Sequence, residues 1–206
     1  MDISIIIIIV ISLISIAGFS QPELIYKFQF NAWQIKNRKE YIRWISHGFF
    51  HADWVHLFVN MYVLFYFGDS LLDNFKWSIP INSNIAFIIL LFSAFVTSSL
   101  RSYFKEKNNY NYNAIGASGA VSAIVFANIL YQPLAMYGFF FINKPILPAI
   151  AFGIGYLIYS RYMSKKNVDN IGHDAHFWGA VYGFVFPILL NPALLLHFFN
   201  ELLSIF

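Results

Sequence analysis

Long apolar stretches separated by short polar segments make up most of the chain. Six of them approach or reach the roughly 20 residues that a helix needs to cross a bilayer: residues 3–19, 49–72, 84–103, 114–131, 147–163 and 173–190. A backbone in lipid has to satisfy its own hydrogen bonds, which a helix does within one segment. The pattern therefore predicts an all-α, polytopic membrane protein, a bundle of six transmembrane helices in which residues 1–206 form a single domain.

Two further segments have the character of membrane-interface helices. Residues 20–46 mix Trp, Tyr and Phe with Lys and Arg and contain no stretch long enough to span, so we expect them to lie at headgroup depth. Residues 192–206 are too short to span and carry polar side chains at helical spacing after Pro192, so we expect a short interfacial helix. His197 falls on the polar side of this tail and is given no role.

The composition supports a membrane protein. Hydrophobic residues make up 59% of the chain and charged residues only 11%, against about 25% charged residues in soluble domains. The absence of cysteine excludes disulfides and thiolate metal sites. The net charge is only +3, and the Lys and Arg residues cluster in loops. We therefore expect the lipid bilayer, and not nucleic acid, as a partner.

Polar residues interrupt the second apolar stretch near its start. In a helix, His47 and His51 would share one face, and His56 and Asn60 would share another, because residues four apart stack one turn above the other. A position among lipid headgroups would explain His47 and His51. It explains His56 and Asn60 poorly, since apolar residues follow for several turns. Polar groups at such depth are costly, so they indicate a functional site that faces the bundle interior.

The number of membrane crossings between the apolar stretches predicts which residues lie on the same side of the bilayer. The second, fourth and sixth stretches are separated by even numbers of crossings, so all three begin on the same side of the bilayer. Near these starts, each a turn or so inside its stretch, lie His56 and Asn60, Ser118, and His176. These four polar residues should therefore lie at a similar depth.

Small residues recur at every fourth position on two of these helices: Gly119, Ala123 and Ala127 on one, Gly179 and Gly183 on the other. Such stripes let helix backbones approach closely in lipid. If the two stripes face each other, Ser118 and His176 come within hydrogen-bond reach.

A serine beside a histidine is a nucleophile with its base. The segment from Gly116 to Gly119 also opens a helix, where backbone N–H groups lack an intrahelical acceptor and can stabilise a developing oxyanion. The candidate oxyanion donors are the backbone at Ala117 and Ser118 and the side chains of His56 and Asn60. Asp174 lies only two residues before His176 and should point elsewhere on the helix. The prediction is a Ser-His dyad with no cofactor and no metal.

These residues resemble the rhomboid family of intramembrane serine proteases. The resemblance covers about residues 40–190 and consists of four motifs in order: Glu40-x2-Arg43, His47-x3-His51-x4-His56-x3-Asn60, Gly116-Ala117-Ser118-Gly119 and His176-x2-Gly179-x3-Gly183. It implies a six-helix rhomboid-like bundle that cuts peptide bonds in or beside the transmembrane helices of other membrane proteins.

The resemblance also implies roles for individual residues. Ser118 would attack the scissile carbonyl, and His176 would take the serine proton and pass it to the leaving amine. The oxyanion would be held by the Ser118 N–H together with His56 and Asn60. Structural and packing roles would fall to the remaining motif residues: Arg43, His47, His51, Gly116, Gly119, Gly179 and Gly183. The site would lie in a water-filled cavity, reached sideways past the fifth span.

Two positions depart from the family pattern. Family members often have a Trp before the loop arginine, where this chain has Ile42. Some members stack an aromatic residue, one turn after the nucleophile, on the histidine, where this chain has Ser122. The second change predicts a looser orientation of His176.

Membrane orientation is a point on which two expectations disagree. The resemblance implies a bacterial inner-membrane protein with its site toward the extracytoplasmic side. The positive-inside rule favours the opposite, because 11 of the 13 basic residues fall on the side of the predicted site: Lys27, Lys36, Arg38, Lys39, Arg43, Arg101, Lys105, Lys107, Arg161, Lys165 and Lys166. Only Lys76 and Lys144 fall on the other side. We expect the family orientation.

Two alternatives stay open. A metal-dependent hydrolase would use His47, His51 and His56 as ligands, although the five-residue step to His56 rotates away on a helix and no HExxH motif is present. A non-catalytic rhomboid-like protein would bind transmembrane clients without cutting them. Such proteins usually lack the serine or the histidine, both of which this chain keeps. We expect His173 and Asp174 to be surface residues of a loop.

Overall fold

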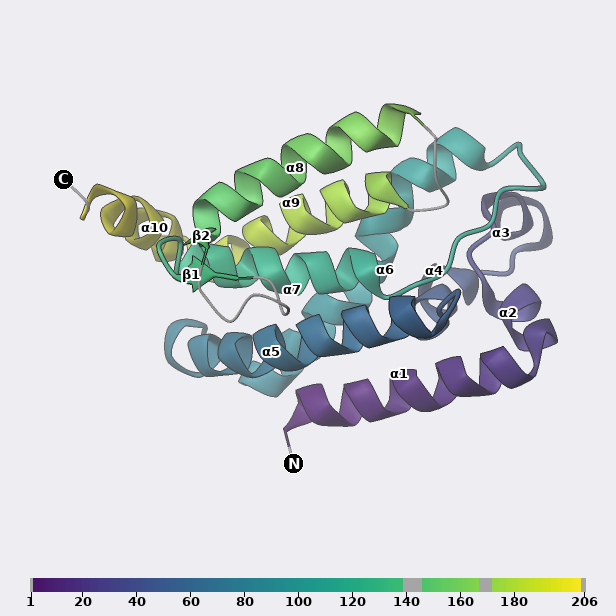
Figure 1. Ribbon diagram of the computed structural model, residues 1–206, viewed down its shortest axis with the longest axis horizontal. Helices are drawn as coiled ribbons and strands as arrows, with labels where there is room; N and C mark the ends of the chain where they lie inside the picture. Colours follow the sequence, from purple (N-terminus) through teal and green to yellow (C-terminus); the bar gives the residue numbers. More distant parts are fainter. Residues whose placement is uncertain (1, 139–145, 167–171, 205–206) are drawn as a thin grey trace.

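Helices form most of the computed structural model, which describes residues 2–138, 146–166 and 172–204. Six long helices run side by side in alternating directions (Figure 1): α1 (Ile3–Ser20), α5 (Trp54–Ser78), α6 (Ser83–Glu106), α7 (Ser118–Tyr131), α8 (Ala149–Lys166) and α9 (His173–Leu190). This arrangement confirms the predicted all-α, polytopic membrane fold.

The shorter elements gather at the two ends of the bundle. Where α5, α7 and α9 begin, the chain forms α2 (Pro22–Phe28), α3 (Ala32–Arg38), α4 (Arg43–Ser46) and the 3-10 turn η1 (His47–Phe49). At the opposite end lie the antiparallel pair β1 (Met136–Tyr137) and β2 (Leu147–Pro148), and α10 (Ala193–Leu203), which is bent by 115° from α9. Lys144 and the last two residues of the predicted tail helix, 205 and 206, lie outside the described residues.

Three described helices, α1, α5 and α6, are long and apolar enough to cross a membrane, and the bent pair α9–α10 makes a fourth if it is one span. Helix α7 is apolar but has only 14 residues. Its length of about 21 Å is shorter than the hydrocarbon core of a bilayer, about 30 Å. The six-span arrangement therefore stays a prediction.

Helix α7 is the core of the bundle. Every residue from 119 to 131 is buried, and α5, α6, α8 and α9 all pack against it (Figure 1). A helix that is enclosed by protein does not have to span the bilayer. The irregular backbone before it can lie at membrane depth, because it is buried in protein or lines a cavity.

The two stripes of small residues meet between α7 and α9, as the sequence predicts. A Cβ atom added at Gly179 would collide with the carbonyl group of Gly119, and one added at Gly183 would collide with the backbone of Ala123. The two backbones are therefore in direct contact, which fixes the second and third turns of α9 against the first two turns of α7.

The predicted boundary of one helix is wrong. Residues 49–53 do not belong to a spanning helix, because the Asp53 side chain accepts the His56 N–H and caps α5 at Trp54. His47 lies in η1 and His51 in the loop before the cap. The expected shared helix face of His47 and His51 does not exist, whereas His56 and Asn60 do lie one turn apart on α5.

The start of α7 also differs from the prediction. Residues 114–117 are not helical, and Ala114 instead forms a β-bridge with Phe30. The helix begins at Ser118. The predicted range 173–190 coincides with α9, and the other predicted ranges differ by only a few residues at their ends.

Candidate active site

The structure brings Ser118 and His176 together at the site end of the bundle. Ser118 opens α7, His176 lies in the first turn of α9, and the Ser118 Oγ and His176 Nε2 atoms are 2.7 Å apart. For the serine hydroxyl to donate to Nε2, the neutral ring carries its own proton on Nδ1. This is the geometry of a nucleophile with its general base.

The turn before Ser118 depends on a glycine. Gly116 has a φ of +125°, a conformation that side chains rarely adopt. An added Cβ would also lie 2.7 Å from the Cε1 atom of His56. The Gly116 N–H donates to the His47 carbonyl at 3.0 Å. Backbone shape and contact with the histidine segment therefore both require glycine here.

His51 holds the next residue of the same turn. The Ala117 N–H donates to His51 Nε2 at 3.4 Å, and His51 Nδ1 lies 2.8 Å from Ser15 Oγ. Ser15 donates its own proton to the Phe49 carbonyl, so His51 Nδ1–H is the donor to Ser15. Because the Ala117 N–H is bonded to His51, it does not point toward a reacting group. Of the two predicted backbone donors, Ala117 is therefore excluded, and the Ser118 N–H in the first turn of α7 remains a prediction.

His56 and Asn60 lie on the α5 face that approaches this turn. His56 Nδ1 accepts the Ala52 N–H at 3.4 Å, which leaves the ring proton on Nε2, the nitrogen nearer to Gly116. Asn60 is buried, and its Nδ2 donates to the His56 carbonyl at 2.8 Å with a second proton still to give. Both side chains can therefore present N–H donors beside Ser118.

A cavity of about 1170 Å³ contains the whole site. Ser118, His176, His56 and Asn60 all line it. Its lining also includes apolar and aromatic side chains of α5 and α8: Val59, Val63, Phe152 and Tyr156. A cavity that is lined by both polar and apolar side chains can admit both water and an apolar peptide segment.

The ring of His176 is held between two aromatic side chains. Tyr156 of α8 stacks on it, with ring centroids 6.3 Å apart and planes at 25°. His173 meets it edge-on at 5.9 Å. The expected loosening of His176 is therefore not found, because an aromatic residue from another helix covers the ring. The sequence interpretation missed Tyr156, and no local motif marks it.

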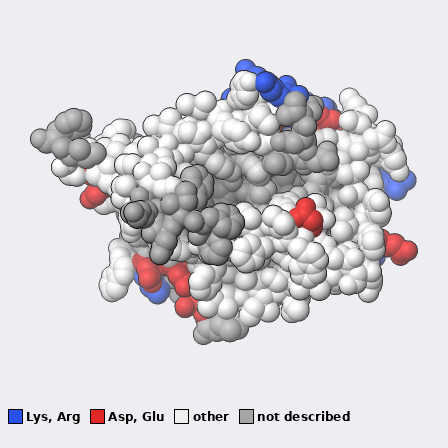
Figure 2. All heavy atoms as spheres, in the orientation of Figure 1, with Lys and Arg blue, Asp and Glu red and all other residues white. Residues whose placement is uncertain are grey.

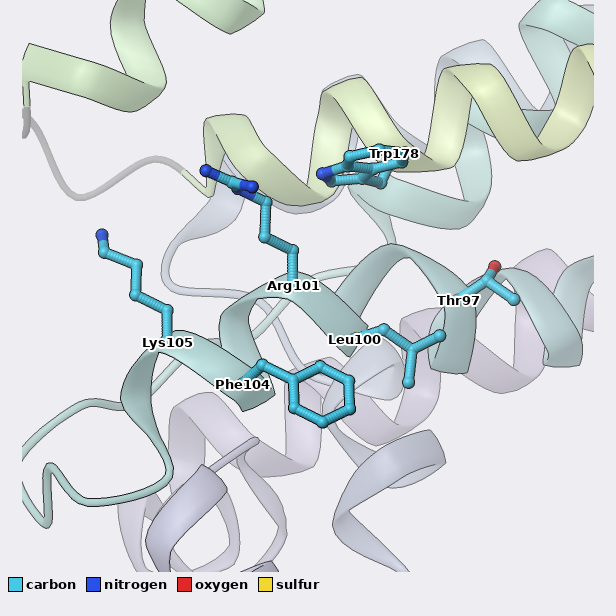
Figure 3. Close-up of a pocket in the computed structure, with 6 residues that line it drawn as sticks. All are labelled: Thr97, Leu100, Arg101, Phe104, Lys105 and Trp178. Atoms are coloured by element: carbon cyan, nitrogen blue, oxygen red, sulfur yellow. The ribbon is translucent and has the colours of Figure 1, made fainter.

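His173 and Asp174 are not the surface residues that we expected. His173 is 4% exposed. Asp174 Oδ1 accepts from Arg101 of α6 at 3.0 Å and lies 3.9 Å from Arg161 of α8. Figure 3 shows Arg101 reaching from α6 toward α9 in a groove that Trp178 also lines. Asp174 thus links the start of α9 to α6 and to α8.

His47 and His51 are buried and serve the scaffold of the site. Burial lowers the pKa of His47 to about 4. Burial, with the charge of His56 as a smaller cause, lowers the pKa of His51 to about 3. Both rings therefore stay neutral at physiological pH. His47 Nε2 lies 3.3 Å from Ser99 Oγ. Among the described residues, no group of three His, Cys, Asp or Glu side chains is placed to hold a metal ion.

Arg43 fixes the segment between α1 and α5. It is 4% exposed and donates to four oxygen atoms, on Glu40 at 2.6 Å, Gln34 at 2.9 Å, and the carbonyls of Tyr26 and Gln29 at 3.2 and 2.7 Å. The guanidinium group thereby closes α2 and α3 onto α4. Its neighbour Ile42 is 59% exposed and takes no part.

The surface agrees with a membrane protein. Figure 2 shows that, among the described atoms of this face, Lys and Arg lie near the edge of the view and uncharged atoms predominate. Exposed side chains of the long helices are often apolar, such as Phe58 and Phe65 on α5 and Ile158 on α8. An integral membrane protein is the class that this surface fits.

The chain matches a protein-family model over most of its length. The model described as Rhomboid domain matches residues 38–193, which include every motif of the site. A search of curated proteins found no match.

Proposed function

Because this chain belongs to the rhomboid family, whose members are mostly serine intramembrane proteases, we propose that it is an intramembrane serine endopeptidase that cleaves transmembrane segments of other membrane proteins. The observation that carries the proposal is the 2.7 Å contact between Ser118 Oγ and His176 Nε2 inside a cavity within the bundle. A protein that only bound clients would have no need of this pair.

In the proposed reaction, Ser118 Oγ bonds to the scissile carbonyl carbon while its proton passes to His176 Nε2. The carbonyl electron pair moves to the oxygen, where the Ser118 N–H and the side chains of His56 and Asn60 stabilise the negative charge. Loss of one such donor typically costs about 3 kcal/mol of transition-state stabilisation.

The intermediate then collapses. The oxygen electron pair re-forms the carbonyl, the carbon–nitrogen bond breaks, and His176 gives its proton to the leaving amine. Water repeats the same steps on the resulting ester and releases Ser118. Water reaches Ser118 through this cavity, and the substrate segment enters between α5 and α8, whose lining side chains include Val59, Val63 and Phe152.

The test is cleavage of a model transmembrane substrate in detergent by the wild type, Ser118→Ala and His176→Ala. Each substitution should lower kcat by about a thousandfold or more, because the two groups act as one unit. Ser20→Ala, which removes an exposed hydroxyl outside the site, is the matched control and should keep full activity. Undiminished hydrolysis in both dyad variants would refute the mechanism. Loss of activity on chelation would instead favour a metal-dependent hydrolase.

We also propose that the site opens toward the extracytoplasmic side. Since the chain has no cysteine, Lys107→Cys creates a single labelling site at the end of α6, on the side of the dyad. A membrane-impermeant maleimide should label it in intact cells. Labelling that requires permeabilised cells would place the site in the cytoplasm.

A further inference from the structure

Tyr156 of α8 is the aromatic residue that covers His176. The two rings are 6.3 Å apart and nearly parallel, at 25°. Tyr156 also packs against Phe126 of α7 at 5.7 Å and against Phe152 of its own helix at 6.0 Å. These contacts lie within the 4.5–7 Å range in which aromatic pairs attract. The Tyr156 ring is therefore held by packing on two sides, and the His176 ring stacks on it.

The hydroxyl of Tyr156 is tied to the backbone of the nucleophile. Ser122 Oγ lies 2.6 Å from the Tyr156 hydroxyl oxygen and 2.8 Å from the Ser118 carbonyl oxygen. A serine hydroxyl has one proton, and a carbonyl can only accept. Ser122 therefore donates to Ser118, and Tyr156 donates to Ser122. The directions of both hydrogen bonds follow from this assignment.

Four side chains on three helices thus form a closed circuit. Ser118 bonds to His176, His176 stacks on Tyr156, Tyr156 donates to Ser122, and Ser122 donates back to the Ser118 carbonyl. Each contact limits the freedom of the next. Within this circuit α8 contributes Tyr156, so the seating of α8 against α7 acts on the reacting pair through this residue, while Tyr159 and Arg161 of α8 reach the first turn of α9 by separate contacts with His173 and Asp174.

We propose that Tyr156 is the positioning residue of the dyad, which holds His176 Nε2 in line with Ser118 only while α8 is seated on α7. The proposal rests on the proposed serine protease function. A base that turns away from its nucleophile loses rate without losing substrate affinity, and a misplacement of about 1 Å can cost about a hundredfold. Ser122 is too short to cover the ring itself, so α8 supplies what α7 lacks.

The experiment compares kcat and KM for four variants on the transmembrane substrate, and the rate at which a fluorophosphonate probe labels Ser118. Tyr156→Phe keeps the ring and should lower kcat about threefold to tenfold, which corresponds to one lost hydrogen bond. Ser122→Ala should match it, and the double variant should lose no more than either single one. Tyr156→Leu removes the ring and should lower kcat about tenfold to a hundredfold. KM should stay within about twofold in all of them, and probe labelling should slow in parallel.

The matched control is Tyr131→Phe. Tyr131 and Ser78 form the same kind of pair at 2.7 Å, but at the far end of α7. This variant should keep the wild-type kcat and probe rate. If Tyr156→Leu raises KM with an unchanged probe rate, Tyr156 only lines the substrate path and the proposal fails. Unchanged kcat in Tyr156→Leu also overturns it, whereas the proposed function falls only if Ser118→Ala stays active.

Discussion

The contact between α7 and α9 sets the distance between the nucleophile and its base, and Gly179→Ala tests this directly. The added Cβ would lie 2.8 Å from the Gly119 carbonyl carbon and closer still to its oxygen, although Cβ contacts below 3.0 Å essentially never occur. Both atoms belong to backbone, which cannot rotate out of the way. Helix α9 must therefore withdraw by on the order of 1 Å.

That withdrawal acts on the dyad. Starting from 2.7 Å, the separation of Ser118 Oγ and His176 Nε2 would exceed the range of about 2.6–3.2 Å in which a base can take the proton. We expect kcat on a transmembrane substrate to fall about a hundredfold. Overpacking should also lower the free energy of unfolding by about 1–3 kcal/mol, which thermal unfolding in detergent would measure.

Gly155→Ala is the matched control for this prediction. Gly155 lies on α8, and an added Cβ would meet no atom within 4 Å. The substitution should leave kcat unchanged and raise the free energy of unfolding by up to about 1 kcal/mol, because alanine favours a helix. If Gly179→Ala matched this control in kcat and stability, the direct backbone contact could not be what positions His176.

Three further predictions concern other parts of the site. Asp174→Asn should change kcat by no more than about threefold and stability by about 1 kcal/mol, because the carboxylate bonds to Arg101; a thousandfold loss of kcat would show that it acts on the dyad. Arg43→Ala should destabilise the fold by about 3 kcal/mol, since four acceptors lose a buried cation; an unchanged melting temperature would contradict this. Acidification from about pH 7 to pH 4 should lower the free energy of unfolding by about 3 kcal/mol through His47 alone. In the unfolded chain, His47 takes up a proton as the pH falls below its ordinary pKa of 6.5. In the folded protein, the buried ring does so only near its pKa of about 4. His51 adds to the loss with the same sign, and thermal unfolding across this pH range should show it. A stability that stays constant would be incompatible with two neutral buried rings.

The meeting of Ser118 and His176 could be predicted from the sequence because its causes are local. Small residues at every fourth position translate directly into a close helix contact, and parity along the chain fixes which ends lie together. The pattern of apolar residues predicts both ends of α9 correctly. No comparable rule assigns a backbone N–H to one acceptor, so Ala117 was placed in the oxyanion site although His51 binds its amide.

The histidine segment shows how a spacing can mislead. His47 and His51 are four residues apart, which suggested one helix face, but the chain between them turns before α5 begins. The signal that separates the two readings is Asp53, an N-cap residue immediately before Trp54. Its presence implies that the residues before it lie outside the helix.

Tyr156 could not have been found from the sequence. Aromatic residues make up 20% of the chain, so one more tyrosine on an apolar helix carries no information. Its role depends on where α8 lies relative to α7 and α9, which is a property of the tertiary structure. Ser122, by contrast, is visible in the sequence as a departure from the family pattern. The structure shows that its hydroxyl lies 2.6 Å from the hydroxyl of Tyr156, whose ring covers His176 in place of the aromatic residue that α7 lacks.

Helix α1 is attached to the bundle by two hydroxyl groups, near its two ends. Ser4 donates to Asp69 on α5 at 2.7 Å, and Ser15 bonds to His51 and to the Phe49 carbonyl. Eleven residues are close to three whole turns, so both serines point the same way. The count of residues between them is therefore fixed. One inserted residue would rotate one anchor by about 100° relative to the other, and α1 would have to release either Asp69 or the histidine that carries the turn before the nucleophile.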